Sequence, residues 1–404
     1  MLKVQELFKT TPWEEAIAKI EELQIKWHIE TSPNFMTVQE YLVLDYSIFA
    51  DTCNPLVKEC RGIALYLDTF EIARLGFHRF LNYGQHGYDK FDPDKPIVYE
   101  EKADGSLIIL RYIEGDGWVA GTRGVMFPKS PVQDSDITFE SLFWRVFNTK
   151  NIDELDKNYE YIFEICSLLN RVVIAYETPQ LVLLSARSIY HLESEVESEI
   201  LDKLYQKIAQ KNIRRVQTFE FNTIEEAVNF SLTMSSKQEG FVAKQWDEEF
   251  KGYKRVKIKG RAYIDLHHTV TCKSLPNLVR LVINGDRDYL NEFPEYLETH
   301  DKVEDELNRY IESCYEALAT GMGASEGIKD EREKRKQFAI NVPNEHKGVC
   351  FAIYDGKTND IKKYIIDSLN ENKSKIKRFI EITNIKSIVG ADWSVSIDNI
   401  DADI

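Results

Sequence analysis

The pattern of apolar residues changes near residue 262, and this change most constrains the fold. From about residue 40 to 260 the chain consists of short β-branched and aromatic runs separated by turn residues, a pattern typical of strands. Helical stretches between these runs are few, so we expect an α+β fold with antiparallel sheets, not a regular βαβ alternation. The predicted strands are 62–67, 96–100, 107–113, 161–165, 181–186, 240–244 and 255–259.

Elsewhere apolar residues recur at helical spacing, which predicts amphipathic helices. One such helix opens the chain, and the others follow residue 262 among many charges. The segment GMGASEG is expected to be a loop or hinge between two of them. We therefore predict two domains, 1–261 and 262–404, the second entirely helical. The predicted helices are 13–24, 275–283, 301–319, 328–340 and 357–383.

Charge and composition exclude several classes of protein. The formal net charge of −16 argues against whole-surface binding to nucleic acid or membrane, although a local basic groove remains compatible with it. No apolar run approaches the ~20 residues that span a bilayer. The N-terminus contains acidic residues and has no apolar core, unlike a secretory signal. The six cysteines form no C-x-x-C pair. We expect a soluble cytoplasmic protein with reduced thiols.

The most informative local motif is KADGS, which begins at Lys102 and lies between two predicted strands. Lys102 is thus expected at a strand end, next to a turn formed by Asp104 and Gly105. A lysine can act as a covalent nucleophile when its pKa falls well below ~10.4. The K-x-D-G pattern is loose, and by itself a surface lysine before a β-turn is the commoner explanation.

A second signal is the basic run KGYKRVKIKGR, which contains no acidic residue. Alternation along a strand places Arg255, Lys257 and Lys259 on one face. Val256 and Ile258 then point to the other, buried face. Three neighbouring like charges repel one another, so this face favours an anion such as a polyphosphate. A solvated, charged edge strand is the alternative.

Two glutamates interrupt apolar, strand-like segments: Glu164 in YIFEI and Glu239 just before GFVAK. A carboxylate there is costly unless it is paired, hydrogen-bonded or bound to a metal. A salt-bridged glutamate is the simpler interpretation of each position. Three arginines also lie beside apolar runs and turns: Arg61 in KECRGIALYL, Arg79 in GFHRFLNYG and Arg123 in VAGTRGVMF.

In chain order these segments resemble the motifs of the covalent nucleotidyltransferase superfamily, which contains polynucleotide ligases and RNA capping enzymes. Within it, the blocks ECRGI, RFLN, KADGSL, FEICSLLNRVVIAY, LVLLSAR, EGFVAK and VKIKGRAYIDLHH resemble the bacteriophage tRNA-repair type of ATP-dependent RNA ligase, the RNA ligase 1 family. The resemblance covers about residues 1–300. It implies a nucleotidyltransferase (ATP-grasp-like ligase) domain followed by a helical domain that contributes RNA specificity. DNA ligases and capping enzymes continue into an OB-fold, which this strand-poor region does not match.

The resemblance also implies a role for each candidate residue. Lys102 becomes adenylylated, and Asp104 and Gly105 shape the turn around it. Arg61 and Glu164 hold the AMP moiety, Glu164 through the ribose hydroxyls. The other implied roles are phosphate contacts by Arg79, Lys257 and Lys259, a functional basic side chain at Arg123, divalent-metal binding by Glu239 and Asp288, and a ligation role for Tyr263.

The implied activity joins 5′-phosphate and 3′-hydroxyl RNA ends with ATP and Mg²⁺ or Mn²⁺, through lysyl-AMP and an adenylated RNA 5′ end, in RNA or tRNA repair. We expect the positive field of Lys257, Lys259 and the metal to lower the pKa of Lys102. The expected partner is RNA, with cleaved tRNA as a candidate, for a monomeric enzyme away from membranes. The alternatives are a DNA ligase, a GTP-dependent capping enzyme or an inactive nucleotide- or RNA-binding homologue. Leu44 departs from the family, which has an aromatic residue near the adenine.

Overall fold

The burial pattern of strand β2 (Glu40–Tyr46) shows how the N-terminal part of the chain is layered. Leu42 and Leu44 are fully buried in a cluster with residues of helices α1 (Lys3–Thr10) and α2 (Trp13–Glu22). Tyr41 and Val43 are fully buried in a second cluster, which includes residues of the next sheet. Because both of its faces are covered, this sheet forms an inner layer. Each fully buried leucine stabilises the layer by about 1.5–3 kcal/mol.

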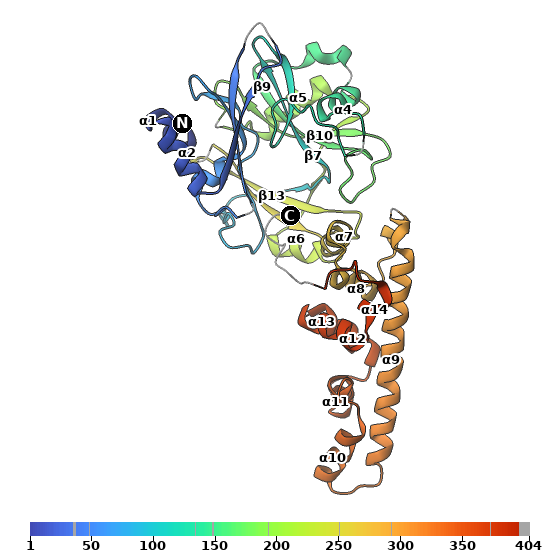
Figure 1. Cartoon of the computed structure of the whole chain (residues 1–404). Helices are drawn as coiled ribbons and strands as arrows, with labels where there is room; N and C mark the ends of the chain where they lie inside the picture. The colour runs from blue at the N-terminus through green and yellow to red at the C-terminus, as the bar shows by residue number, and fades with distance from the viewer. Residues whose placement is uncertain are drawn as a thin grey trace. The chain divides into compact units, whose positions relative to one another are not determined.

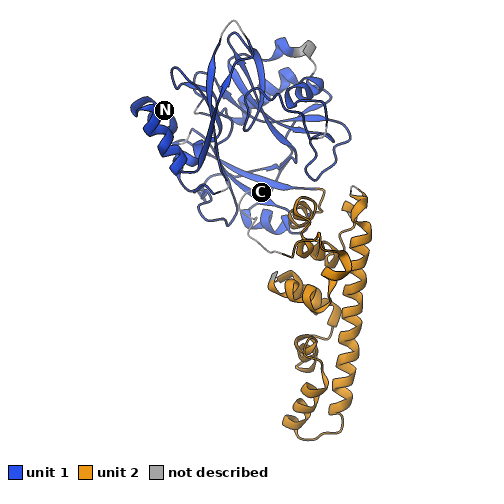
Figure 2. Cartoon of the chain, in the orientation of Figure 1, with its two compact units in different colours: residues 1–234, 238–260, 402–404 blue, residues 235–237, 261–401 orange. Residues whose placement is uncertain are grey.

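The computed structural model describes residues 1–34, 38–47, 49–133, 135–147, 149–192, 194–249, 251–291, 293–371 and 373–395. The chain divides into two units, coloured separately in Figure 2. Unit 1 contains residues 1–234 and 238–260, and unit 2 contains residues 235–237 and the described residues from Arg261 onwards.

Three sheets build unit 1 (Figure 1). The first is antiparallel throughout, in the order β1-β2-β3-β4. The second has the order β11-β10-β9-β7-β8, and the third the order β12-β6-β13-β14-β5. The remaining strands of the first two sheets are β1 (Ile25–Thr31), β3 (Arg61–Tyr66), β4 (Ile72–Arg74), β7 (Ser106–Ile113), β8 (Gly117–Thr122), β9 (Tyr159–Cys166), β10 (Gln180–Ser188) and β11 (Ile213–Arg215). The strands of the third sheet are β5 (Leu81–Asn82), β6 (Val98–Glu101), β12 (Thr218–Phe219), β13 (Gly240–Asp247) and β14 (Gly252–Lys259).

Helices cover the outer faces of the second and third sheets. Helices α4 (Phe139–Val146) and α5 (Ser198–Ile208) bury Phe143 and Leu204 in one cluster with Ile108 and Phe163 of the second sheet. Helix α6 (Ile224–Ser231) contributes to the cluster of the third sheet. Two short helical segments complete the unit: α3 (Pro55–Glu59) and the 3₁₀ helix η1 (Thr149–Glu154).

Unit 2 is built from helices, with α9 the longest element (Figure 1). None of the described helices is both long and apolar enough to cross a membrane. The elements are α7 (Arg261–Cys272), α8 (Leu275–Ile283), η2 (Asp288–Asn291), η3 (Pro294–Tyr296), α9 (Leu297–Ser325), α10 (Glu331–Asn341), α11 (Lys347–Tyr354), α12 (Ile361–Glu371), α13 (Lys373–Ile382) and α14 (Ile385–Val389).

The α+β class with a following helical region is confirmed, and each predicted strand corresponds to an observed one. The sheets are not purely antiparallel, because the edge strands β11 and β5 pair parallel to their neighbours. The predicted helix 357–383 is two helices, α12 and α13, and it begins later because Asp360 caps the backbone N–H of Lys363 (2.9 Å).

The predicted loop at GMGASEG is wrong for residues 321–325, because α9 continues to Ser325, and only Glu326 and Gly327 form a turn beyond it. The reason is packing against α10. A Cβ at Gly321 would lie 2.6 Å from a methyl of Val342 and 2.9 Å from the ring of Phe338. Gly321 therefore serves the close approach of two helices, and the packing of α9 outweighs the low helix propensity of glycine.

Candidate active site

Lys102 lies directly after β6, where the chain turns towards β7. Its backbone N–H donates to the carbonyl oxygen of Gly240 on β13 (2.9 Å), so the third sheet fixes its position. The carboxylate of Asp104 accepts hydrogen bonds from the backbone N–H groups of Val173 (3.0 Å) and Ile174 (2.6 Å). These bonds anchor the turn that presents the lysine.

Gly105 occupies a point of close approach in the same turn. A Cβ there would lie 2.3 Å from the carbonyl oxygen of Ile165 on β9. The backbone cannot retreat easily, because the next residue, Ser106, is paired with Ile165 in the β7–β9 ladder. Space alone therefore requires glycine at this position.

An ion cluster surrounds the end of the Lys102 side chain. Its Nζ lies 2.5 Å from Oε1 of Glu239, and Nζ of Lys259 lies 3.5 Å from the same oxygen. The Lys102 side chain is 21% exposed, whereas those of Glu239 and Lys259 are 4% and 5% exposed. The Lys102 side chain is thus partly accessible, while the groups that set the charge of its amine are shielded.

The pKa of Lys102 is raised, contrary to the expectation that it would fall. Burial lowers the pKa, but the carboxylates of Glu239 and Glu164 raise it by more, with a further contribution from Asp104. The amine is therefore protonated in this geometry. Loss of its carboxylate counter-ion, not only a positive field, is needed before it can attack as a neutral amine.

For the other charged groups of the site, burial shifts each pKa in the direction that favours the neutral form. Burial, together with Lys102 and Arg61, holds the pKa of Lys257 well below its usual value. Burial lowers the pKa of Lys259 to about 8, against the attraction of Glu239. Burial also raises the pKa of Glu164 to about 8, and Lys102 offsets only part of this rise. Buried lysines favour a phosphate, and buried carboxylates favour a metal ion. The site therefore suits a ligand that brings both.

Three of the predicted cations lie near aromatic rings, those of Tyr46 and Phe80, which the sequence interpretation missed. The guanidinium of Arg79 lies 4.5 Å from the ring centre of Tyr46, and that of Arg123 lies 5.8 Å from the same ring. Phe80 plays the same part for Lys257, whose Nζ is 5.3 Å from its ring centre. Cations over rings gain favourable electrostatic energy. The position of Phe80, directly after Arg79 in RFLN, was the available signal.

Arg61 and Arg123 differ in how fully their side chains are satisfied. Nε of Arg123 donates to Oδ2 of Asp45 (3.1 Å). Nη1 of Arg61 is buried and has no hydrogen-bond partner among the described residues. A buried guanidinium donor without an acceptor is costly, so the Arg61 position suits a polar ligand group. With the carboxylate of Glu239 and the two lysines of β14, the donor set fits a nucleotide and a divalent cation.

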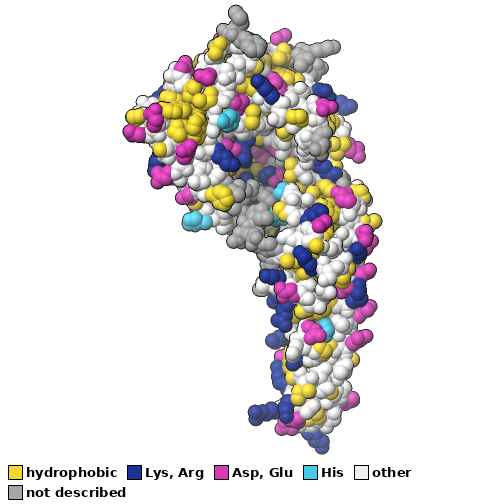
Figure 3. Space-filling model, viewed as in Figure 1, with side chains coloured by type: hydrophobic (Ala, Val, Ile, Leu, Met, Phe, Trp, Pro, Cys, Tyr) yellow, Lys and Arg dark blue, Asp and Glu magenta, His cyan; other side chains and the backbone are white. Residues whose placement is uncertain are grey.

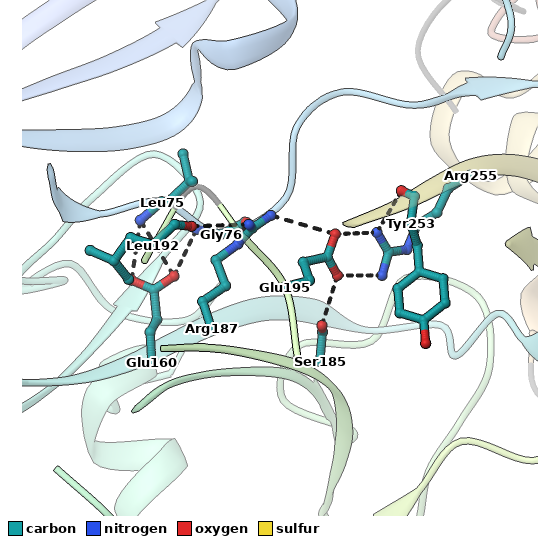
Figure 4. Close-up of polar contacts among 9 residues, drawn as sticks. All are labelled: Leu75, Gly76, Glu160, Ser185, Arg187, Leu192, Glu195, Tyr253 and Arg255. Atoms are coloured by element: carbon teal, nitrogen blue, oxygen red, sulfur yellow. Dashed lines mark hydrogen bonds and ion pairs between the residues drawn. The ribbon is translucent and has the colours of Figure 1, made fainter. Parts of the chain in front are cut away.

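Arg255 does not join the two lysines as predicted. Val256 and Ile258 are buried, as the alternation predicted, but the Arg255 side chain is buried as well. Its two Nη atoms bind the carboxylate of Glu195 at 2.7 and 2.6 Å (Figure 4). Ser185 Oγ also donates to this carboxylate (2.8 Å), and Nη2 of Arg187 lies 3.6 Å from it.

Glu195 is therefore the anion that Arg255 requires. Burial tends to raise the pKa of Glu195, but the guanidinium groups of Arg255 and Arg187 hold it far below its usual value. Arg255 is satisfied from within the protein, so of the three cations predicted on one face of β14 only Lys257 and Lys259 remain candidates for contact with a ligand.

The same buried network reaches the segment that leads to Arg79. Nε of Arg187 donates to the carbonyl oxygen of Gly76 (2.7 Å). The carboxylate of Glu160 accepts the backbone N–H groups of Leu75 (3.1 Å) and Gly76 (2.9 Å). Figure 4 shows these contacts in one row with the Glu195 cluster. The network thus fixes both β14 and the approach to Arg79.

Two predicted positions, Tyr263 and Asp288, belong to unit 2, and a third, Leu44, lies in the core of unit 1. Tyr263 is 1% exposed on α7 of unit 2, and its role stays a prediction. Asp288 begins η2, also in unit 2, and its side chain lies outside the described part of the chain. The side chain of Leu44 packs in the core with residues of α1 and α2, so it cannot stack on a base.

Comparison with known proteins identifies the family of the chain. A family model described as RNA ligase matches residues 59–263, about half of the chain. The chain belongs to this RNA ligase family. The family predicted from the motifs is thereby confirmed, and the matched region contains every candidate residue of unit 1 listed above.

Several individual proteins are similar to this member of the family. It is 28% identical to a protein of Autographa californica nuclear polyhedrosis virus named "Putative bifunctional polynucleotide kinase/RNA ligase", over 87% of this chain and 50% of the relative. It is 27% identical to the "RNA ligase" of Rhodothermus phage RM378, over 66% of this chain and 69% of the relative. Among solved structures, an "Archaeal ATP-dependent RNA ligase" matches 85% of this chain and 80% of its own with 13% identity and a TM-score of 0.42. The chain spans about half the length of the viral relative.

Proposed function

We propose that this RNA ligase family member joins RNA ends at the expense of ATP through a covalent lysyl-AMP at Lys102. The observation that carries the proposal is the cluster around that amine. A partly exposed lysine at a strand end meets Glu239 at 2.5 Å, with Lys259 beside the same oxygen. A surface lysine before an ordinary turn would have no such surroundings.

The chemistry has three steps. The neutral Nζ of Lys102 attacks the α-phosphorus of ATP, forming a P–N bond as the bond to pyrophosphate breaks. An oxygen of an RNA 5′-phosphate then attacks the lysyl-AMP, which releases the lysine and leaves an adenylated 5′ end. Finally a 3′-hydroxyl attacks that 5′ phosphorus, expels AMP and seals the strand. Such transfers depend mainly on positioning and charge.

We assign the residues of unit 1 by their chemistry. Arg61, whose buried Nη1 has no hydrogen-bond partner within the described ranges, and Glu164 hold the AMP moiety. Lys257, Lys259 and Arg79 contact phosphates. A Mg²⁺ or Mn²⁺ ion held by Glu239 would neutralise phosphate charge. Asp104 and Gly105 position the nucleophile, while Arg123, held by Asp45, borders the site.

The wider assignments extend the same proposal. The helical C-terminal domain, residues 262–404, contributes RNA specificity, and Tyr263 acts in the sealing steps. Asp288 is a second candidate metal ligand. The substrate is RNA with 5′-phosphate and 3′-hydroxyl ends, including broken tRNA, and the enzyme acts as a monomer in the cytoplasm.

The test is incubation with α-labelled ATP and Mg²⁺ without RNA, followed by a denaturing gel. We expect label on the wild-type protein and none on Lys102→Ala. Lys95→Ala, which removes another lysine of unit 1, is the matched control and should label normally. Pyrophosphate pretreatment removes any AMP already attached. Label on Lys102→Ala would refute the nucleophile, and labelling by GTP but not ATP would favour a capping enzyme.

A further inference from the structure

Unit 2 contains a pocket of about 210 Å³ among helices α9, α11, α12 and α13. Its lining includes the aromatic residues Tyr310, Tyr364 and Phe379, the acidic residue Glu345, and two cations, Lys375 and Arg378, called the rim cations below. The two tyrosines are half-buried, and the two cations are exposed. Pockets for larger ligands usually measure ~300–1,000 Å³, so this volume suits one flat, ring-sized group.

The aromatic walls are held in place by neighbouring contacts. The ring of Tyr310 meets that of Phe379 edge to face, with centres 5.4 Å apart and planes at 76°. The Tyr310 hydroxyl donates to the carbonyl oxygen of Glu345 (3.4 Å). Prepared aromatic surfaces of this kind bind nucleobases, because every base has a π face to stack on.

The segment that forms part of the pocket has a net positive charge, whereas the whole chain is acidic. Residues 362–386 contain seven lysines and arginines and three acidic residues, in a chain with a net charge of −16. Figure 3 shows Lys and Arg side chains gathered along the edge of the helical unit away from α9. A local positive surface on an acidic protein favours a polyanion at one place only.

The two rim cations are available to such a ligand. Several cations of α10 are engaged, as in the pairs of Lys336 with Glu333 and of Arg335 with Asp355. Lys375 and Arg378 form no ion pair within the described part of the chain. They can therefore bind phosphates without first breaking an internal contact.

We propose that this pocket binds one unpaired nucleobase of the RNA substrate, and that Lys375 and Arg378 contact the phosphates on either side of it. The base stacks against the tyrosine walls, and the apolar floor excludes water from its face. This inference rests on the proposed function and adds to it a defined base-binding site distant in sequence from the adenylylation motifs.

The first test measures binding of a fluorescent, single-stranded oligoribonucleotide to the full chain by anisotropy. The variant Lys375→Glu/Arg378→Glu should bind at least tenfold more weakly. Its matched control is Lys363→Glu/Lys377→Glu, which makes the same charge change at exposed positions of α12 and α13 outside the pocket lining. The plot of log affinity against log salt should flatten by about 1.4 for two lost contacts with single-stranded RNA.

The second test examines the base itself. An abasic residue is moved along the oligoribonucleotide, and one position should weaken binding to the wild type about tenfold. Tyr364→Ala should bind more weakly and lose this dependence on the abasic position, whereas Tyr364→Phe, which keeps the ring, should behave as the wild type. Thermal unfolding of each variant identifies any that do not fold.

Equal weakening by the two double variants would reduce the effect to general electrostatics and overturn the proposal. A flat abasic scan would overturn it as well. Failure of the proposed function is separate, since wild-type labelling by α-labelled ATP needs no RNA. A chain that labels at Lys102 but shows neither effect is a ligase without this base pocket.

Discussion

Replacing Glu195 by glutamine tests whether the buried ion network holds unit 1 together. The substitution keeps the shape of the side chain and removes its charge. Arg187 and Arg255, whose side chains are 1% and 7% exposed, then lose their shared counter-ion. Breaking a buried pair in this way costs about 3–5 kcal/mol, because the charges left behind remain desolvated. The contacts at 2.6 and 2.7 Å to Arg255 carry most of this cost.

Thermal unfolding followed by tryptophan fluorescence measures the effect. For a domain of this size, 1 kcal/mol corresponds to roughly 2–4 °C, so Glu195→Gln should lower Tm by about 6–20 °C. Asp202→Asn is the matched control, because it removes an exposed partner of Arg215 and should cost at most about 1 kcal/mol. A Tm for Glu195→Gln that equals that of the control would refute the reasoning.

The pH dependence of the same network has a defined sign. The pKa of Glu195 is depressed on folding, so its stabilisation is present above the ordinary glutamate pKa and is lost as pH falls through the depressed value. The difference in Tm between wild type and Glu195→Gln should therefore stay constant from pH 5 to 8 and shrink only in strong acid. A difference that disappears near neutrality would contradict the assignment of the carboxylate as an ionised counter-ion.

Three further predictions follow from single positions. Gly105→Ala should abolish labelling by α-labelled ATP and lower Tm, because its Cβ would lie 2.3 Å from the carbonyl oxygen of Ile165; normal labelling would contradict this. The raised pKa of Glu164, about 8, means that the folded chain holds this proton where the unfolded chain releases it, so stability should fall from pH 4.5 to 8. Glu164→Gln should show a smaller fall, and an identical profile would exclude Glu164 as the cause. Gly321→Leu should lower the free energy of unfolding by about 1–3 kcal/mol through overpacking against Phe338, as urea unfolding would measure, while an unchanged midpoint would mean that α9 is not held there.

The sequence predicted the local parts of the site well. Strand alternation correctly placed Val256 and Ile258 inside, and the turn residues correctly placed Lys102 at the end of a strand. Both depend on interactions between near neighbours, which leave a periodic signal. The order of the motifs identified the RNA ligase family for the same reason: each block is a short stretch whose chemistry is carried by adjacent residues.

Contacts between residues that are far apart in the chain were decided by tertiary structure alone. Arg255 looked like a third phosphate ligand, yet folding brings it to Glu195, and no periodicity relates the two positions. Glu239 raises the pKa of Lys102 although the two are far apart in the chain. In the sequence Gly321 suggested a hinge, whereas in the structure it allows α10 to pack closely against α9. By itself, the sequence determined the strands, the turn and the family. Three-dimensional packing decided which charges meet and which glycines are helical, because burial and distance set electrostatic and steric energies.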